Sequence, residues 1–182
     1  DMLKWWLEND YYKPEYHPEK DTVQSVEEMR EDGRESWTLV CPPPNAYGRP
    51  HIGNISGYAY MDAMARYQRM QGKKVLMLPG KDHAGLEGEG VFFFFFLEKK
   101  KRRKFDMKRS DFYNEMMDWM HQNMETALQD EKNIGLSADF DRNTFTLDED
   151  IVETVLDTFV EMYKEGMIYK GVRIVNWDPK AR

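Results

Sequence analysis

The sequence predicts an α/β fold in which helices flank a parallel sheet. Two apolar runs, Trp37–Cys41 and Val75–Leu78, are typical of buried strands. The segment between them, residues 52–71, is rich in small residues and methionine and stops at Gly72, as a helix packed on a sheet would. A strand, a helix and a strand in this order form a βαβ unit, whose two strands run parallel.

The residues before the first strand are expected to form a short helical arm. Residues 2–12 are aromatic-rich and indicate a short helix, whereas residues 13–34 are polar and marked by prolines. We therefore assign residues 1–36 to an N-terminal arm and residues 37–182 to the α/β domain.

Beyond the second strand, helices are expected to dominate. Residues 86–135 are helical in pattern, with an interruption near residues 101–110, and Gly135 is expected to close the last of these helices. Thr146 and Glu149 have the spacing of a capping box, which predicts that the next helix begins here. This helix should end at Gly166, and residues 168–169 and 172–177 are predicted to form a further strand. Its apolar residues recur at the spacing of a buried face: Ile151, Val152, Val155, Phe159 and Tyr163.

Composition limits the class of protein. The chain has 182 residues, 41% of them hydrophobic and 32% charged, which suits one domain with a core, and its net charge of −7 argues against a general nucleic-acid coat. The single cysteine, Cys41, excludes intramolecular disulfides, gives no zinc-binding spacing and is expected to be a small buried side chain. With no apolar stretch long enough for a membrane span and no signal peptide, we expect a cytoplasmic protein without membrane partners.

Two segments have unusual composition. Phe92–Phe96 are five consecutive phenylalanines, for which the sequence offers no functional explanation. Lys99–Lys104 are six consecutive basic residues, for which a solvated helix end or loop is favoured over a contact to tRNA or phosphate.

The loop after the first strand carries the chemistry. Pro42, Pro43, Pro44 and Asn45 lead through a rigid segment to a helix that begins near His51. The first N–H groups of a helix lack intrahelical partners and therefore bind anions. His51 and Asn54 lie one turn apart at this helix start and can donate hydrogen bonds to phosphate, while Gly53 between them lets a nucleotide approach the backbone. In isolation this pattern would be ascribed to chance and ordinary capping, but the prolines and the flanking strand favour a nucleotide site.

A second loop, Gly80–Gly85, follows the second strand and should open into the same crevice, because ligands bind at the carboxyl ends of parallel strands. Asp82 in this loop is either the cap of the next helix or a carboxylate suited to an ammonium group, and His83 is expected to be a structural hydrogen-bonding residue. The sequence has no P-loop, dinucleotide-binding or zinc-protease motif. The site should therefore act by positioning and electrostatics, as in in-line attack on an α-phosphate with magnesium on the leaving pyrophosphate.

These loops resemble a known family. His51-Ile52-Gly53-Asn54 is similar to the HIGH signature of class I aminoacyl-tRNA synthetases, and Pro42–Asn45 and Leu78–Gly85 resemble the valyl-tRNA synthetase versions of the neighbouring loops. The resemblance covers residues 37–182 and continues in later segments: Ile134–Arg142, Phe145–Asp148, Ile168–Gly171 and Arg173–Pro179.

The resemblance implies a Rossmann-like domain that condenses valine with ATP to valyl-adenylate and then charges tRNA(Val). It implies that His51 and Asn54 contact the ATP phosphates, that Gly53 faces the adenine–ribose side, and that Asp82 holds the substrate ammonium. The amino-acid pocket would be lined by Pro42, Pro43 and Asn45. The last position of HIGH is Asn54 here, an amide that can replace an imidazole as a donor.

The same resemblance implies parts that this sequence lacks. The KMSKS signature, the editing insertion and the anticodon-binding domain are absent, so the chain resembles the first half of a split active site, a fragment expected to bind ATP weakly and to charge little or no tRNA alone. Its partners would be valine, ATP with Mg²⁺, tRNA(Val) and the remaining domains, with no protein-bound zinc. Two alternatives remain: a non-catalytic synthetase-like binding module, and another nucleotidyltransferase of the HIGH type.

Overall fold

The computed structural model describes residues 2–94 and 107–178. The chain divides into two compact units, Asp1–Thr146 and Leu147–Arg182. Of the segments with unusual composition, Phe95, Phe96 and the basic run Lys99–Lys104 lie outside the described residues.

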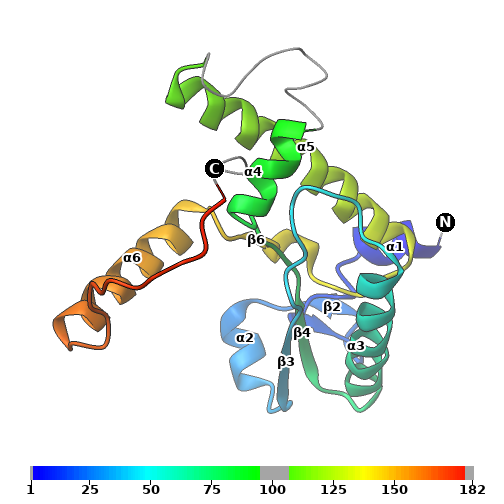
Figure 1. Ribbon diagram of the computed structural model, residues 1–182. Helices are drawn as coiled ribbons and strands as arrows, with labels where there is room; N and C mark the ends of the chain where they lie inside the picture. The colour runs from blue at the N-terminus through cyan, green and yellow to red at the C-terminus, as the bar shows by residue number, and fades with distance from the viewer. Residues whose placement is uncertain (1, 95–106, 179–182) are drawn as a thin grey trace. The chain divides into compact units, whose positions relative to one another are not determined.

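The first unit is built on a parallel strand pair. β3 (Ser36–Val40) pairs with β4 (Lys74–Leu78) in parallel, so that Ser36 lies opposite Lys74 and Val40 opposite Leu78. α3 (Ile52–Met70) connects the two strands and runs alongside them (Figure 1). It stops before Gly72, whose φ of 79° is a left-handed conformation that favours glycine. This arrangement confirms the predicted βαβ unit.

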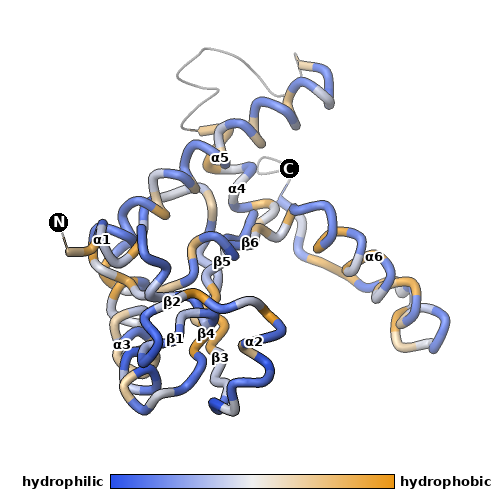
Figure 2. Tube along the Cα trace, turned by 180° about the vertical axis from the view of Figure 1, so that it is seen from behind, coloured by the Kyte–Doolittle hydropathy of each residue, from blue (hydrophilic) through white to orange (hydrophobic). Residues whose placement is uncertain are grey.

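A small core lies between α3 and the strands, with Cys41 buried in it as expected. Burial raises the pKa of the Cys41 thiol to about 11, and the Glu131 carboxylate adds to the effect. β4 contributes apolar residues to this core and is coloured as hydrophobic in Figure 2. Only part of the small-residue composition of α3 serves this packing, because Ala65 is buried whereas Ala59 and Ala63 are exposed. The remaining buried members of the core are Tyr58, Val75, Met77, Leu136 and Ala138.

Past Pro79 the chain forms a second, separate parallel pair, β5 (Gly80–Lys81) and β6 (Thr144–Phe145). The chain is tightly packed here: a Cβ added to Gly80 would lie 3.3 Å from the Thr144 carbonyl oxygen and 3.5 Å from Cβ of Pro43. The close approach of three segments at Gly80 fixes the loop that follows it.

The N-terminal arm contains more structure than its sequence predicts. α1 (Met2–Glu8) falls within the expected helix, but the polar stretch also holds the antiparallel strands β1 (Tyr16–His17) and β2 (Thr22–Val23) and the helix α2 (Val26–Glu31). Strands of two residues are too short to show a hydropathy period, which is why the sequence did not reveal them.

A polar cluster attaches the arm and the 135–138 segment to α3. Asp62 Oδ1 accepts from the Ser137 backbone N–H at 2.8 Å, and Arg69 donates to the Ser137 carbonyl at 2.8 Å and to the Tyr12 carbonyl at 3.2 Å. Burial lowers the pKa of Arg69 to about 10. These bonds hold the N-terminal arm on the helix that begins with His51.

The described part of the region after β5 is helical as predicted, whereas most of the expected interruption near residues 101–110 lies outside the described residues. The described part comprises α4 (Leu86–Phe92) and α5 (Arg109–Asn133), and Gly135 with φ 81° terminates α5. Phe92 is buried, and its ring lies 5.5 Å from that of Phe112 and 5.4 Å from that of Trp119. A single-turn 3-10 helix, η3 (Phe140–Arg142), precedes β6.

The second unit corrects three expectations. α6 (Glu149–Lys164) has Asp148 as its N-cap, so the predicted capping box at Thr146 is wrong; Thr146 belongs to the first unit and bonds elsewhere. None of the apolar residues of α6 is buried, although their spacing predicted a buried face. Residues 168–178 form no strand, because none of the described segments offers them a neighbouring strand to pair with. Within residues 2–94 and 107–178, no helix has both the length and the apolar character needed to cross a bilayer.

Candidate functional site

The two loops predicted to share a crevice lie next to each other. The Ala46 N–H donates to the Asp82 carbonyl at 2.7 Å, and the Asp82 N–H donates to the Pro44 carbonyl at 2.9 Å. The proline loop and the loop after β5 are thus joined by a short parallel bridge at the carboxyl ends of β3 and β4, where α/β sheets bind ligands.

A hollow of about 140 Å³ opens at the start of α3. Three of the predicted site residues, Asn45, His51 and Asn54, line it together. The other lining residues are Pro44, Tyr47, Gly48, Arg49, Pro50 and Ala127. The remaining predicted residues do not line it: Pro42, Pro43, Gly53 and Asp82.

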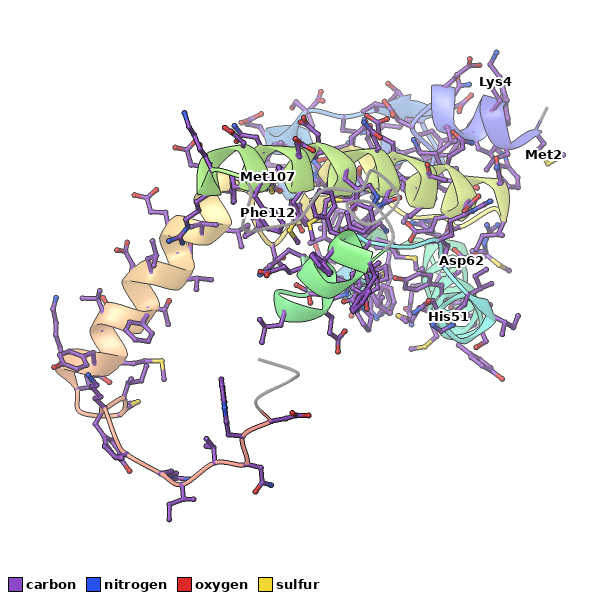
Figure 3. The ribbon with its side chains drawn as sticks, turned by 45° about the horizontal axis from the view of Figure 1, so that its top comes forward. Met2, Lys4, His51, Asp62, Met107 and Phe112 are labelled. Atoms are coloured by element: carbon purple, nitrogen blue, oxygen red, sulfur yellow. The ribbon has the colours of Figure 1, made fainter. Side chains whose placement is uncertain are left out.

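His51 and Asn54 form a reciprocal cap on α3. The His51 Nδ1 accepts from the Gly53 N–H at 3.0 Å, and the Asn54 Oδ1 accepts from the His51 N–H at 3.2 Å. A neutral imidazole whose Nδ1 accepts carries its proton on Nε2, and the amide of Asn54 is left with its Nδ2 hydrogens. Figure 3 shows His51 at one end of α3, with Asp62 further along the same helix. The cap takes up the N–H groups of His51 and Gly53, so it is the two side-chain groups that this helix start offers to an anion.

Gly53 is needed for this cap. A Cβ at this position would lie 2.9 Å from Cε1 and 3.0 Å from Nδ1 of His51, closer than carbon atoms normally approach. Any other residue would displace the imidazole from the helix N-terminus, so the glycine serves the position of His51.

The Asp82 side chain bonds to Thr146, which follows β6, and does not cap a helix. α4 begins at Leu86 with Gly85 as its N-cap, so the capping role weighed for Asp82 is wrong. The Thr146 hydroxyl donates to Asp82 Oδ1 at 3.1 Å and accepts from the His83 N–H at 2.9 Å. His83 is a structural hydrogen-bonding residue, as predicted. Thr146 was assigned to the following helix from its sequence, so its place in this cluster was missed.

A buried ion pair lies next to the loop that carries Asp82. Lys81 Nζ lies 2.6 Å from Glu131 Oε1, and both side chains are 1% exposed. Burial raises the pKa of Glu131. The Lys81 ammonium acts in the opposite direction, but burial has the larger effect. The pair links β5 to α5 one residue before Asp82, and because Lys81 is neutralised by Glu131, the Asp82 charge remains available to a ligand.

Two further contacts anchor the proline loop. Arg49, with a side chain 72% exposed, makes a bidentate pair with Asp130 of α5, with distances of 2.7 Å from Nε and 2.6 Å from Nη2. The Tyr47 hydroxyl accepts from Asn45 Nδ2 at 2.8 Å and donates to Glu87 at 3.1 Å. The Arg49–Asp130 and Tyr47–Glu87 pairs join residues far apart in the sequence, so no local pattern predicts them.

Pro42 and Pro43 lie where the loop leaves the sheet. The Tyr58 hydroxyl of α3 donates to the Pro42 carbonyl at 3.1 Å, and Pro43 approaches Gly80 as described above. Across residues 2–94 and 107–178, no three His, Cys, Asp or Glu side chains are grouped so as to hold a metal ion.

The chain is similar to proteins of known family. The sequence model of a family described as tRNA synthetases class I (I, L, M and V) matches residues 1–182. A valine--tRNA ligase of Parabacteroides distasonis is 36% identical over 178 residues, 98% of this chain and 19% of its own length. One from Mesorhizobium japonicum is 41% identical over 150 residues, 82% of this chain and 16% of its own length. The chain thus spans about a fifth of the curated relatives that it matches.

A solved structure supports the fold. The agnB2 LeuRS of Agrobacterium radiobacter K84, crystallised in a ternary complex with tRNA and LeuAMS, has a TM-score of 0.66 at 18% identity, and the match covers 92% of this chain and 17% of that one. At this identity the likeness shows the Rossmann-like fold alone, and the family rests on the sequence match. The resemblance inferred from the sequence motifs is confirmed: over its whole length, residues 1–182, this chain belongs to the class I tRNA synthetases of the I, L, M and V group.

Proposed function

We propose that this chain forms the part of a valine--tRNA ligase active site that holds the ATP phosphates and the amino group of valine. In the reaction, a carboxylate oxygen of valine attacks the α-phosphorus of ATP, the bond from this phosphorus to the β-phosphate oxygen breaks, and pyrophosphate leaves. Transfer of the valyl group to tRNA(Val) follows. Magnesium enters as part of the substrate, bound to the ATP phosphates.

The observation that carries the proposal is the hollow at the start of α3, with His51 and Asn54 on its wall. Nε2–H of His51 and Nδ2–H₂ of Asn54 would donate to phosphate oxygens. Such donors, already fixed by the reciprocal cap, stabilise the charge that develops on the phosphates during attack. Gly53 would face the adenine–ribose side.

The amino acid would bind at the neighbouring loop. Asp82, whose backbone is joined to the proline loop by two hydrogen bonds, carries a carboxylate that suits an α-ammonium group. Pro42, Pro43 and Asn45 would line the side-chain pocket. Identity of 36% and 41% to two curated valine--tRNA ligases supports valine as the substrate. The second phosphate-binding half, the editing and anticodon-binding domains and a cytoplasmic location are further parts of this proposal.

The test uses valine-dependent pyrophosphate exchange by the protein at its full encoded length. His51→Asn preserves the N-cap, since asparagine caps helices well, but removes the outward imidazole donor. We expect kcat to fall by about 10²–10³, the usual cost of losing one donor to a transition-state oxyanion. Ser25→Asn, the same kind of cap replacement on α2, is the matched control and should leave exchange unchanged.

Undiminished exchange by His51→Asn would contradict the phosphate role. The 182-residue chain by itself is expected to show little exchange, because half of the phosphate site would be missing. Strong valine-dependent exchange by the chain alone would refute the split site, and a full-length protein without any exchange would favour a non-catalytic binding module.

A further inference from the structure

Thr146 lies at the carboxyl end of β6, directly beside the loop that carries Asp82. Its backbone N–H donates to the Lys81 carbonyl at 3.1 Å, which extends the β5–β6 pairing by one residue. Its hydroxyl oxygen lies 3.1 Å from Asp82 Oδ1, 2.9 Å from the His83 backbone nitrogen and 2.7 Å from His83 Nδ1. One hydroxyl thus meets three polar partners.

The number of protons determines how these contacts are arranged. A threonine hydroxyl has one hydrogen and two lone pairs. Asp82, when ionised, only accepts, and the His83 backbone N–H only donates. If the hydroxyl hydrogen points to Asp82, the remaining lone pair must accept from His83 Nδ1–H. The opposite arrangement would turn hydroxyl lone pairs toward the carboxylate, with no hydrogen between them. The proton of His83 is therefore assigned to Nδ1, which also lies 3.5 Å from Asp82 Oδ1.

The cluster leaves one face of the carboxylate for a ligand. The side chain of Asp82 is 38% exposed, and in the described part of the chain the Thr146 hydroxyl and His83 Nδ1 approach its Oδ1 atom. The hydroxyl carries no charge, and Lys81 is already paired with Glu131. The second oxygen, Oδ2, is thereby presented with a fixed orientation.

We propose that Thr146 is a positioning residue, whose hydroxyl, itself held by His83, fixes the Asp82 carboxylate so that Oδ2 receives the ammonium group of the amino-acid substrate. The proposal rests on the ammonium role of Asp82 in the proposed function. A half-exposed aspartate would otherwise sample several rotamers, and part of the binding free energy would be spent on ordering it. Thr146 supplies this order before the substrate arrives.

The test compares Thr146→Val, Thr146→Ser and Asp82→Ala in the full-length protein by valine-dependent pyrophosphate exchange. Valine at position 146 keeps the shape but loses the hydroxyl, and we expect it to raise KM for valine about tenfold or more while KM for ATP stays within about twofold, since a hydrogen bond to a charged group is lost on the amino-acid side only. Serine restores the hydroxyl and should restore KM for valine. Thr144→Val, on the exposed threonine two residues earlier, is the matched control.

A substrate analogue without the amino group separates positioning from general support of the loop. Inhibition of exchange by 3-methylbutanoate, which has the carboxylate and side chain but no ammonium, should be equal in the wild type and in Thr146→Val. Equal weakening of valine, ATP and 3-methylbutanoate would overturn the proposal, as would an unchanged KM for valine. If Asp82→Ala retains its KM for valine, the ammonium role itself fails; if Asp82→Ala loses activation and Thr146→Val does not, only the positioning role fails.

A second measurement needs no variant that might fold poorly. The ¹⁵N shifts of His83 in the wild-type protein report which ring nitrogen carries the proton. A protonated Nδ1 is expected. An Nε2–H tautomer would overturn the proposal, because the hydroxyl hydrogen would then be directed to the ring and not to Asp82.

Discussion

Replacing Lys81 with methionine is expected to destabilise the first unit by about 3–5 kcal/mol, the usual cost of removing one partner from a buried ion pair. Both Lys81 and Glu131 are 1% exposed, and their charged atoms are 2.6 Å apart. Methionine has a similar length and no charge, so Glu131 would be left as an unpaired carboxylate. Its Oε2 atom already lacks a hydrogen-bond partner in the described structure, so no other donor is at hand to compensate.

A double-mutant cycle separates the pair from the packing around it. The buried pair is costly to desolvate, so Lys81→Met/Glu131→Leu should recover most of the loss and fall within about 1–2 kcal/mol of the wild type. The pH dependence has a definite sign. Burial raises the pKa of Glu131, and loss of Lys81 raises it further, so the folded variant takes up a proton more readily than the unfolded chain as pH falls. The penalty of Lys81→Met should therefore be smaller at pH 5 than at pH 7.

Urea denaturation followed by tryptophan fluorescence measures these free energies of unfolding in the four proteins. Single variants that each cost less than about 1 kcal/mol would refute the reasoning, because a desolvated, unpaired charge cannot be that cheap. A double variant as unstable as the sum of the single ones would also refute it, since the two side chains would then act independently.

Three other changes test separate parts of the unit. Gly53→Ala should lower pyrophosphate exchange with little change in the urea midpoint. The loss of the His51 cap destabilises the helix and the better helix propensity of alanine stabilises it, each by about 1 kcal/mol. A variant with full exchange would contradict the role of this glycine. Gly88→Ala places a Cβ 2.7 Å from the His83 carbonyl oxygen and 2.8 Å from Cε of Met120, so overpacking should cost about 1–3 kcal/mol in the same denaturation assay, and an unchanged midpoint would show that the loop yields easily. Asp32, with a side chain 3% exposed, is subject to burial that tends to raise its pKa, but hydrogen bonds from Arg34 and Lys74 outweigh it and hold the pKa well below the model-peptide value of 3.8. Its stabilising effect is complete above pH 3.8 and declines as pH falls toward the lower folded pKa; the difference in stability between wild type and Asp32→Asn should therefore be constant from pH 7 to about pH 5 and shrink below pH 4, whereas a difference that grows on acidification would contradict the pairing.

The parts of the fold that were predicted correctly depend on local sequence. The apolar runs of β3 and β4 and the composition of α3 each lie within one element, and Gly72 and Gly135 mark helix ends through their own backbone conformation. The meeting of the proline loop with the Asp82 loop followed from a general property of parallel sheets, namely that consecutive carboxyl ends lie side by side. Site residues on these two loops could be named for that reason.

What failed depends on partners distant in sequence. The spacing of Thr146 and Glu149 is that of a capping box, yet the hydroxyl of Thr146 bonds to Asp82, 64 positions earlier in the chain. The 172–177 segment has the composition of a strand, but pairing is a property of two segments, and the described residues supply only one. The periodic apolar face of α6 likewise shows which side chains could be buried, but it does not identify a segment that would cover them.

The sequence by itself determined the βαβ unit, the helix start that carries His51 and Asn54, and the family, because each is encoded in contiguous residues. Only the tertiary structure decided that Lys81 is neutralised by Glu131, that Gly53 makes room for the His51 ring, and that Thr146 and His83 orient Asp82. The physical reason is that hydrogen bonds, ion pairs and steric contacts act over a few ångströms in space. Residues that are joined in this way can be far apart in the sequence, and no local sequence pattern then identifies them as partners.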